Sequence, residues 1–559
     1  MSDVMLDEPA RRDFLKLGVA ITTGVIVPPI LSACGGGDGD SGYKPPTETF
    51  FEPLNIQSVN GVLDVTLNIA YVTSTITNIP PGATTPVTTK VKLRNMYGTL
   101  PAPTLRMNVG DKLRIRVVNL LPVNPPDPEP TKHLRYHNST NLHTHGLHVY
   151  PDIIRQPTPA DPAGLYGDFV VDDPDAGIQP GEIRQYEYMI RSDHPAGTYW
   201  YHPHLHGSSA MQVGSGMAGA LIIEGPIDEV PEIAAAQERI FVFQAPIYDA
   251  SGQLENFGQV ATSSAGAVGE PGFLINGVLR PRILMKTGEV QNWRFINAAI
   301  FNMLNLSLDG HTLYQYSHDG NPRHNLKPVA PLPLPVVGAP PPTAYPEAIV
   351  LAAANRTNVL VKAGAPGTYQ LRTMPVEIGR NPAGVLPMSI VADIVVTDDP
   401  YPMSLPTGPL PVTPFLAPIT DEELAAHGGL KRTIVMRVVG SNPPATFPQT
   451  DPPTPPILPF TGTAKTPLIN PPDGELPDWV FQTAFGQPLK QTPVANKVYA
   501  LGSAGTVATT SPGMPSEYIP FQSSRALTQT VALNSVEEWT IVNMNNIRHP
   551  FHIHVNPMY

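Results

Sequence analysis

The sequence predicts an all-β chain made of three consecutive domains of similar construction. Three segments begin with a polar turn and continue as alternating apolar and polar residues: 109–119 (VGDKLRIRVVN), 287–297 (TGEVQNWRFIN) and 533–543 (LNSVEEWTIVN). Such alternation is typical of a strand with one buried face. A second pattern, a Pro/Gly turn that leads into Gly-Thr-Tyr, recurs at 194–202 and 364–372. Because the repeats lie far apart, they indicate repeated β-domains rather than a short-period solenoid.

The bulk composition agrees with this fold class and excludes some functions. A chain of 559 residues is too long for one hydrophobic core. Its 68 prolines and 46 glycines divide the apolar runs into short segments, as expected for strands joined by long loops. The net charge of −12 and the absence of a basic stripe argue against a nucleic-acid partner. No apolar run reaches the length of a mature transmembrane helix.

The first 45 residues predict export rather than a folded domain. Residues 11–16 (RRDFLK) and the apolar run 17–31 resemble a bacterial twin-arginine signal, which predicts a periplasmic or other extracytoplasmic protein. Residues 31–34 (LSAC) resemble a lipobox, so we expect Cys34 to carry lipid and to anchor the protein to a membrane. Ordinary signal cleavage, with Cys34 as a bystander, is the alternative. The Gly/Asp/Ser run that comes next would be a flexible linker.

Changes in composition divide the rest of the chain into three domains, at 46–228, 229–400 and 401–559. The segments 224–232 and 397–415, which are rich in proline and acidic residues, separate them. Residues 420–430 (TDEELAAHGGL) predict one short helix, with Thr420 as its N-cap and Gly428 as its stop.

Three groups of histidines have the spacing of metal ligands. Residues i and i+2 of a strand point to the same face, so an H-x-H pair aims two imidazoles the same way. Neutral imidazole suits copper, zinc, iron or nickel, and several converging pairs would hold more than one ion. A single pair would more often be a polar surface feature. The groups are His143 and His145 in NLHTHG, His202 and His204 in WYHPHLHG, and His549, His552 and His554 in HPFHIH.

These motifs, together with GMAGALIIEG at 216–225, resemble three of the four copper motifs of the multicopper oxidases, above all the laccase-like members. The resemblance spans residues 50–559 in the right order. It implies three cupredoxin-like Greek-key β-sandwich domains, of which the third is incomplete. It also implies an oxidoreductase that oxidises phenolic, aromatic or metal-ion substrates and reduces dioxygen to water. The implied ligands are His143 and His552 for type 2 copper, His145, His202, His204 and His554 for the type 3 pair, and His549 for type 1 copper.

The fourth motif of that family, H-C-H, is not found. A blue type 1 site needs a thiolate, and the one cysteine is Cys34. The repeat spacing also places the last strands of the third domain beyond Tyr559. We therefore expect the sequence to be a C-terminally incomplete multicopper oxidase that binds copper partially and is inactive alone.

Two other functions stay open at this point. One is a non-catalytic copper-binding or structural cupredoxin protein of the cell envelope. The other is a relative of the two-domain copper nitrite reductases, against which the three repeats count. We further expect Trp200 to pack beneath the metal cluster and His311 to be structural. His148 and His206 would either hydrogen-bond to the ligand loops or be merely exposed. The sequence does not identify the reductant or the oligomeric state.

Overall fold

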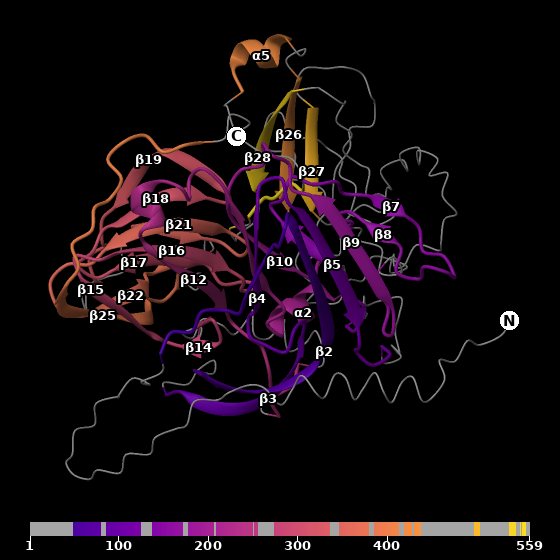
Figure 1. Cartoon of the computed structure of the whole chain (residues 1–559), viewed down its shortest axis with the longest axis horizontal. Coiled ribbons are helices and arrows are strands. Elements are labelled where there is room, and N and C mark those ends of the chain that lie inside the picture. The colour runs from indigo at the N-terminus through magenta and orange to yellow at the C-terminus, as the bar shows by residue number, and fades with distance from the viewer. Residues whose placement is uncertain are drawn as a thin grey trace, which may run out of the picture. The chain divides into compact units, whose positions relative to one another are not determined.

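The structure is a computed structural model (Figure 1). Contacts between residues separate Pro46–Tyr559 as one compact unit from the part of the chain before it, which lies outside the described residues. All residues that the structure describes lie in this unit. Cys34, His206 and His549 lie outside them. The described ranges are 49–79, 85–124, 137–170, 177–205, 208–249, 251–254, 273–335, 346–378, 385–412, 419–426, 430–437, 497–502, 536–543, 548 and 550–554.

The first part of the chain forms a β-sandwich, here called sandwich A. One sheet has the order β1-β4-β11-β10-β6 and the other has the order β3-β2-β5-β9-β8-β7. The two sheets enclose one core, to which Leu221 and Tyr199 contribute from the first sheet and Ile115 and Tyr186 from the second. The strands are β1 Asn55–Gln57, β2 Val62–Asn78, β3 Val87–Asn95, β4 Ala102–Asn108, β5 Lys112–Asn119, β6 His143–His145, β7 Ile153–Arg155, β8 Leu165–Tyr166, β9 Ile183–Met189, β10 Gly197–His202 and β11 Gly219–Glu224.

A second sandwich, sandwich B, comes after the short helices α2 (Ser209–Gly214) and α3 (Pro231–Ala234). Its sheets have the orders β14-β13-β12-β16-β21-β18-β19 and β15-β25-β22-β17-β20, and β23 and β24 pair separately. Figure 1 shows β12, β16, β21 and β18 side by side. The strands are β12 Gln237–Gln244, β13 Leu274–Ile275, β14 Val278–Leu279, β15 Arg282–Thr287, β16 Val290–Asn297, β17 Leu304–Leu308, β18 Leu313–His318, β19 Asn321–Val329, β20 Ile349–Leu351, β21 Arg356–Lys362, β22 Gly367–Thr373, β23 Val376–Glu377, β24 Val385–Leu386 and β25 Ser389–Pro400.

The remaining described elements are a helix and a parallel sheet with the order β27-β26-β28. The strands are β26 Leu430–Arg437, β27 Lys497–Gly502 and β28 Glu537–Asn543. Helix α5, Asp421–Ala426, begins as predicted: the Thr420 hydroxyl accepts the Glu423 N–H at 3.2 Å, and the Glu423 carboxylate accepts the Thr420 N–H at 2.9 Å. No helix among the described residues is long and apolar enough to cross a membrane.

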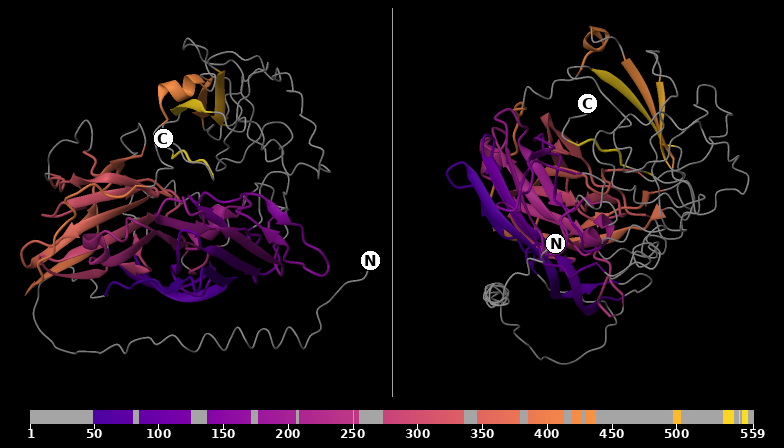
Figure 2. Two further views of the ribbon diagram at one scale, coloured as in Figure 1. Left: turned by 45° about the horizontal axis from the view of Figure 1, so that its top comes forward. Right: turned by 90° about the vertical axis from the view of Figure 1, so that its right-hand side faces the viewer.

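The predicted all-β class is confirmed, and among the described residues Figure 2 shows mostly strands with a few short helices. The three segments chosen for their alternation contain β5, β16 and β28. One detail differs from the prediction, because β16 is buried along its whole length rather than on one face. Trp293 and Phe295 point into the core of sandwich B, whereas Ile296 packs with Trp200 and Ile222 of sandwich A. The second face of β16 is therefore covered by the neighbouring sandwich.

Buried charges join the two sandwiches beside this apolar contact. Arg294 on β16 forms ion pairs with Asp228 and Glu238, and Glu238 also pairs with Arg106 of β4. The Arg294 side chain is 2 % exposed, so each charge needs its partner to offset the loss of hydration. The network holds β12 and β16 of sandwich B against β4 of sandwich A, close to the strand that carries the predicted metal ligands.

Candidate metal centre

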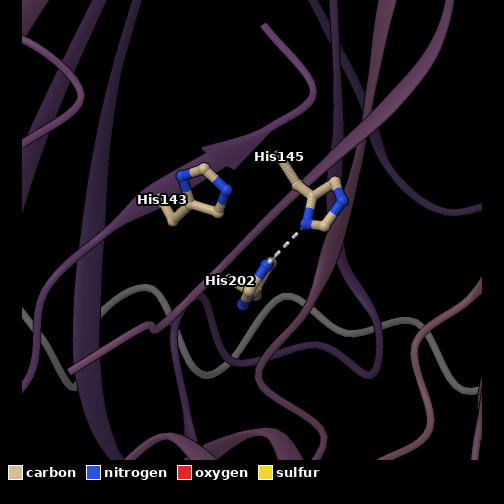
Figure 3. Close-up of side chains that lie close together, drawn as sticks. All are labelled: His143, His145 and His202. Carbon is tan, nitrogen blue, oxygen red and sulfur yellow. Dashed lines mark hydrogen bonds between the residues drawn. The ribbon is translucent and has the colours of Figure 1, made fainter. Parts of the chain in front are cut away.

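Two neighbouring strands of sandwich A bring the first histidines together. Strand β6 consists of His143, Thr144 and His145, and it pairs antiparallel with β10 so that His143 lies opposite His202. Because side chains alternate along a strand, His143, His145 and the cross-strand His202 all lie on one face. Figure 3 shows the three rings gathered there. Their ring centroids are 5.3–5.5 Å apart, and their candidate ligand atoms all lie within 4.8 Å of one another.

The fourth histidine of sandwich A lies just past the end of β10. The His204 backbone N–H donates to the side-chain oxygen of Asn141 at 2.6 Å, which fixes this loop against the residues that precede β6. The His204 ring centroid lies 5.2 Å from that of His143 and 5.9 Å from that of His202. His202 at the end of β10 and His204 just past it therefore face the same space as the histidine pair of β6.

The C-terminal histidines lie against this group. His554 stacks on His143, with ring centroids 4.1 Å apart and an interplanar angle of 8°. His552 stacks on His145, with ring centroids 3.9 Å apart and an angle of 12°. His143, His552 and His554 form a second set of ligand atoms within 4.8 Å. The structure thus brings together the six predicted histidines that lie within the described residues.

A buried carboxylate fixes the ring of His143. Asp168 Oδ2 lies 2.8 Å from His143 Nδ1, while Oδ1 accepts the Thr144 N–H at 2.8 Å and the Thr144 hydroxyl at 3.1 Å. Both side chains of the His143–Asp168 pair are 1 % exposed. Because an ionised carboxylate only accepts hydrogen bonds, Nδ1 of His143 carries the proton and Nε2 keeps its lone pair. That buried Nε2 has no hydrogen-bond partner among the described residues.

The rings of His202 and His145 are also oriented. His202 Nδ1 donates to the Pro203 carbonyl at 2.9 Å, so its Nε2 is the nitrogen left to act as a ligand. This Nε2 lies 3.3 Å from His145 Nδ1, the contact drawn in Figure 3. The indole of Trp200 stacks on His202 at 3.9 Å, which confirms that it packs beneath the cluster.

Burial controls the charge of the cluster. It lowers the pKa of His143, His145 and His202 well below the usual value, and neighbouring histidines lower all three further. The charge of Arg356 adds to the lowering of the pKa at His143 and His145. Burial likewise lowers the pKa of His552 to about 4 and that of His554 to about 2. These imidazoles are therefore neutral at pH 7. Burial raises the pKa of Asp168 to about 6, so this carboxyl is ionised at pH 7 beside neutral rings.

The structure also shows the contacts of other histidines that are not predicted ligands. His148 is half-buried, and its backbone N–H donates to His194 Nε2 at 3.0 Å. His194 in turn donates from Nδ1 to the Pro195 carbonyl at 2.9 Å. His311 uses both nitrogens, one with the Asp309 carbonyl and one with the Gly364 N–H, so the prediction that it is structural is confirmed.

Sequence reasoning missed Asp168, the carboxylate that orients His143. It lies 25 residues from His143 in the chain, in the loop after the two-residue strand β8. No spacing rule connects an aspartate at that distance with a histidine pair. A search for acidic residues between the two histidine motifs would have found it only as one of several candidates.

The chain is similar in sequence to proteins described as multicopper oxidases and laccases. Residues 131–228 and 496–559 match two family models, each described as multicopper oxidase. The "Multicopper oxidase mco" of Staphylococcus haemolyticus is 26% identical over 232 residues, which cover 41% of this chain and 43% of that protein. "Laccase-4" of Thanatephorus cucumeris is 28% identical over 247 residues, which cover 42% of this chain and 41% of that protein. The chain thus spans less than half the length of these curated relatives.

Solved structures of similar fold include a multicopper oxidase from Campylobacter jejuni, described as a metallo-oxidase. It has a TM-score of 0.47 and 22% sequence identity, and the match covers 70% of this chain and 67% of that one. The McoA multicopper oxidase from Aquifex aeolicus has a TM-score of 0.48 and 19% identity, with 71% and 72% covered.

Proposed function

We propose that this chain is a multicopper oxidase, which the family models matching residues 131–228 and 496–559 support, and that its clustered histidines hold copper ions at which dioxygen is reduced. The observation that carries the proposal is the buried group of neutral imidazoles around His143, whose Nε2 is aimed among other rings and has no hydrogen-bond partner within the described chain. A buried nitrogen without a partner is unfavourable by itself, and a metal ion would satisfy it.

The donor set fits copper. Imidazole nitrogen is a ligand that suits copper, and several neutral rings hold a cation without bringing protons into the site. We propose the following ligands: His143 and His552 for one ion, and His145, His202, His204 and His554 for a pair. His549, which lies outside the described residues, would be a type 1 ligand without the thiolate that such a site needs. Bound copper would supply the redox chemistry, taking electrons singly from a reductant and passing them to dioxygen, which forms water.

The protein's own residues keep the ligands ready for this role. Asp168 accepts the Nδ1 proton of His143 and so reserves Nε2 for the metal. The Pro203 carbonyl does the same for His202. Trp200, which is buried, covers one face of the His202 ring and excludes water from it. These contacts fix the tautomer and the orientation of each ring before a metal ion arrives, which lowers the cost of binding.

The substrate and the cellular setting are further parts of the proposal. We propose a phenolic, aromatic or metal-ion reductant, with dioxygen as the electron acceptor. A blue type 1 site needs a thiolate, and Cys34 is the one cysteine of the 559 residues. We therefore propose that these residues bind copper without forming a blue site and do not oxidise phenols alone. The twin-arginine-like segment and Cys34 support export and a lipid anchor.

The experiment is a copper titration of the full chain, completed by metal analysis of the desalted protein. We expect more than one copper ion per chain, and we expect the H143A/H202A double variant to lose most of it. His324→Ala is the matched control, since His324 is an exposed histidine on β19 of the other sandwich. If the double variant retained the copper of the wild-type chain, the proposed site would be wrong.

The same sample tests the proposal that these 559 residues are inactive alone. A non-catalytic copper-binding protein of the cell envelope would bind copper through the same histidines but would not consume dioxygen. Oxygen uptake in the presence of a phenol would contradict the proposal that these 559 residues are inactive alone. It would also exclude the non-catalytic alternative.

A further inference from the structure

The strand that carries Trp200 and His202 is held at its beginning by sandwich B. Thr198, the second residue of β10, donates its hydroxyl to the Asn358 side-chain oxygen at 2.6 Å. Its carbonyl accepts a hydrogen bond from Arg356 Nε at 3.3 Å. Asn358 and Arg356 both belong to β21. The position of a ligand strand of sandwich A therefore depends on side chains of sandwich B.

Partners within sandwich B fix the side chain of Arg356. Its side chain is 4 % exposed, and Nη1 lies 3.1 Å from Asp319 Oδ1. The same oxygen accepts the Arg356 backbone N–H at 2.8 Å, while Oδ2 accepts the side chain of Asn355 at 2.6 Å. Nη1 also donates to the Ala354 carbonyl at 3.2 Å. The guanidinium plane is thus set by partners within sandwich B.

The other edge of the guanidinium faces the second ligand strand. Gly146 comes directly after His145, and its φ of +89° is a conformation that favours glycine. A Cβ atom placed on Gly146 would lie 2.6 Å from Arg356 Nη2 and 2.9 Å from the Tyr199 ring. The bare backbone after β6 therefore lies directly against the arginine. One side chain of sandwich B contacts the beginning of β10 and the end of β6 together.

We propose that Arg356 is a positioning residue of the metal centre, which holds the beginning of β10 and the end of β6 against sandwich B and through them the placement of His145 and His202. The proposal rests on the function proposed above, since it concerns how tightly those histidines hold copper. The planar fork of arginine places Nε on Thr198, Nη1 on Asp319 and Nη2 beside Gly146 at the same time. Lysine has a single ammonium group and cannot reproduce these three directions.

Arg356 also places a positive charge near the cluster. That charge contributes to lowering the pKa of His143, His145 and His552, although burial is the larger cause at each of them. Charge and geometry can be separated by substitution, because lysine retains the charge and loses the fork. Methionine loses both and keeps a similar apolar length.

The test compares Arg356→Lys and Arg356→Met with the wild-type full chain. Copper affinity would be measured by competition with a chelator, and the environment of bound Cu(II) by its electron paramagnetic resonance spectrum. We expect both variants to bind copper about 10–100-fold more weakly, with an altered spectrum. The matched control is Arg372→Lys on β22, which alters an arginine paired with Asp309 in the same sandwich. It should leave affinity and spectrum unchanged.

The outcomes distinguish this proposal from the proposed function. If the wild-type chain bound no copper, the proposed function would fail and the positioning role with it. If the wild-type chain bound copper and Arg356→Lys matched it in affinity and spectrum, only the positioning role would be overturned. Thermal unfolding of all variants checks whether R356K and R372K lose similar stability, so that a difference in copper binding does not merely report partial unfolding.

A double-mutant cycle with Gly146→Ala gives an independent check. In the wild-type chain the added methyl would meet Arg356 Nη2, so copper affinity should fall. In the R356M background that contact is absent, and the same alanine should cost less. Strain from the positive φ is present in both backgrounds and cancels. Equal losses in the two backgrounds would overturn the proposed contact.

Discussion

Replacing Asp168 by asparagine should weaken copper binding while leaving the fold intact. The carboxylate accepts from His143 Nδ1 with one oxygen and from the Thr144 N–H with the other. Asparagine offers one oxygen and one NH₂ group in nearly the same shape. If the oxygen faces Thr144, the NH₂ group faces His143 Nδ1 and forces the ring proton onto Nε2. That nitrogen could then no longer bind a metal ion.

The size of the expected loss in copper affinity follows from the other orientation of the asparagine amide. To keep Nε2 available, the amide must turn its oxygen to His143 and leave the buried Thr144 N–H unpaired. An unpaired buried donor costs about 1–3 kcal/mol. At about 1.4 kcal/mol for each factor of ten, copper affinity should fall roughly 5–150-fold, which overlaps the 10–100-fold typical of residues that orient metal ligands.

Folding stability should not change in parallel with the copper affinity. Burial raises the pKa of Asp168 from 3.8 to about 6, so keeping it charged at pH 7 costs the folded protein about 3 kcal/mol relative to the unfolded chain. The neutral amide avoids that cost and offsets the loss of a hydrogen bond. We therefore expect the unfolding free energy of copper-free D168N to equal or exceed that of the wild-type chain.

The assay is chelator competition at pH 7, accompanied by urea unfolding without copper. The matched control is Asp309→Asn, which removes a carboxylate paired with Arg372 and leaves the His143 ring untouched. Wild-type copper affinity in D168N would refute the tautomer argument. So would an equal loss in D309N, since the effect would then not depend on the contact with His143.

Two further predictions concern stability. Burial lowers the pKa of His194 from 6.5 to about 4, and protonation of its Nε2 would break the hydrogen bond from the His148 N–H. The unfolded chain therefore binds this proton more readily than the folded protein. As the pH drops from about 6.5 to about 4, the unfolding free energy should fall by up to about 3 kcal/mol because of this residue. His194→Gln should flatten that pH dependence in urea titrations, and an unchanged slope would contradict the assignment. Leu306→Ala removes a fully buried side chain from β17 and should lower the unfolding free energy by about 2–5 kcal/mol. Leu284→Ala is the control and should cost far less, because Leu284 on β15 is 52% exposed. Equal losses would show that the core of sandwich B is assigned wrongly.

The positions of the histidines could be anticipated from the sequence where they follow from the period of a strand, whereas their roles as copper ligands stay a prediction. The H-x-H spacing of His143 and His145 fixes that both rings leave β6 on the same side, whatever surrounds them. The same rule applies to the other two pairs only approximately, because His204 lies past the end of β10 and neither His552 nor His554 lies in a strand. The structure nevertheless brings all of these rings together. The role of His549 stays a prediction, since it lies outside the described residues.

Asp168 and Arg356 illustrate what the sequence did not reveal. An aspartate in a loop and an arginine at the start of a strand have many ordinary uses, and nothing in their local sequence points to a histidine cluster. Asp168 acquires its role because it is buried against His143. Arg356 acquires its role because sandwich B packs against β10, more than 150 residues earlier in the chain.

The sequence by itself therefore determined the all-β class, the repeated strand pattern and the histidines that share a face, since these depend on a period of two along the chain. Only the tertiary structure decided what lies opposite each face. It buried β16 on both sides, placed a carboxylate behind His143 and set an arginine of sandwich B against the beginning of β10 and the end of β6. The physical reason is that strand periodicity is a local property of the backbone. The partner of a buried polar group is chosen by packing between segments that are distant in sequence.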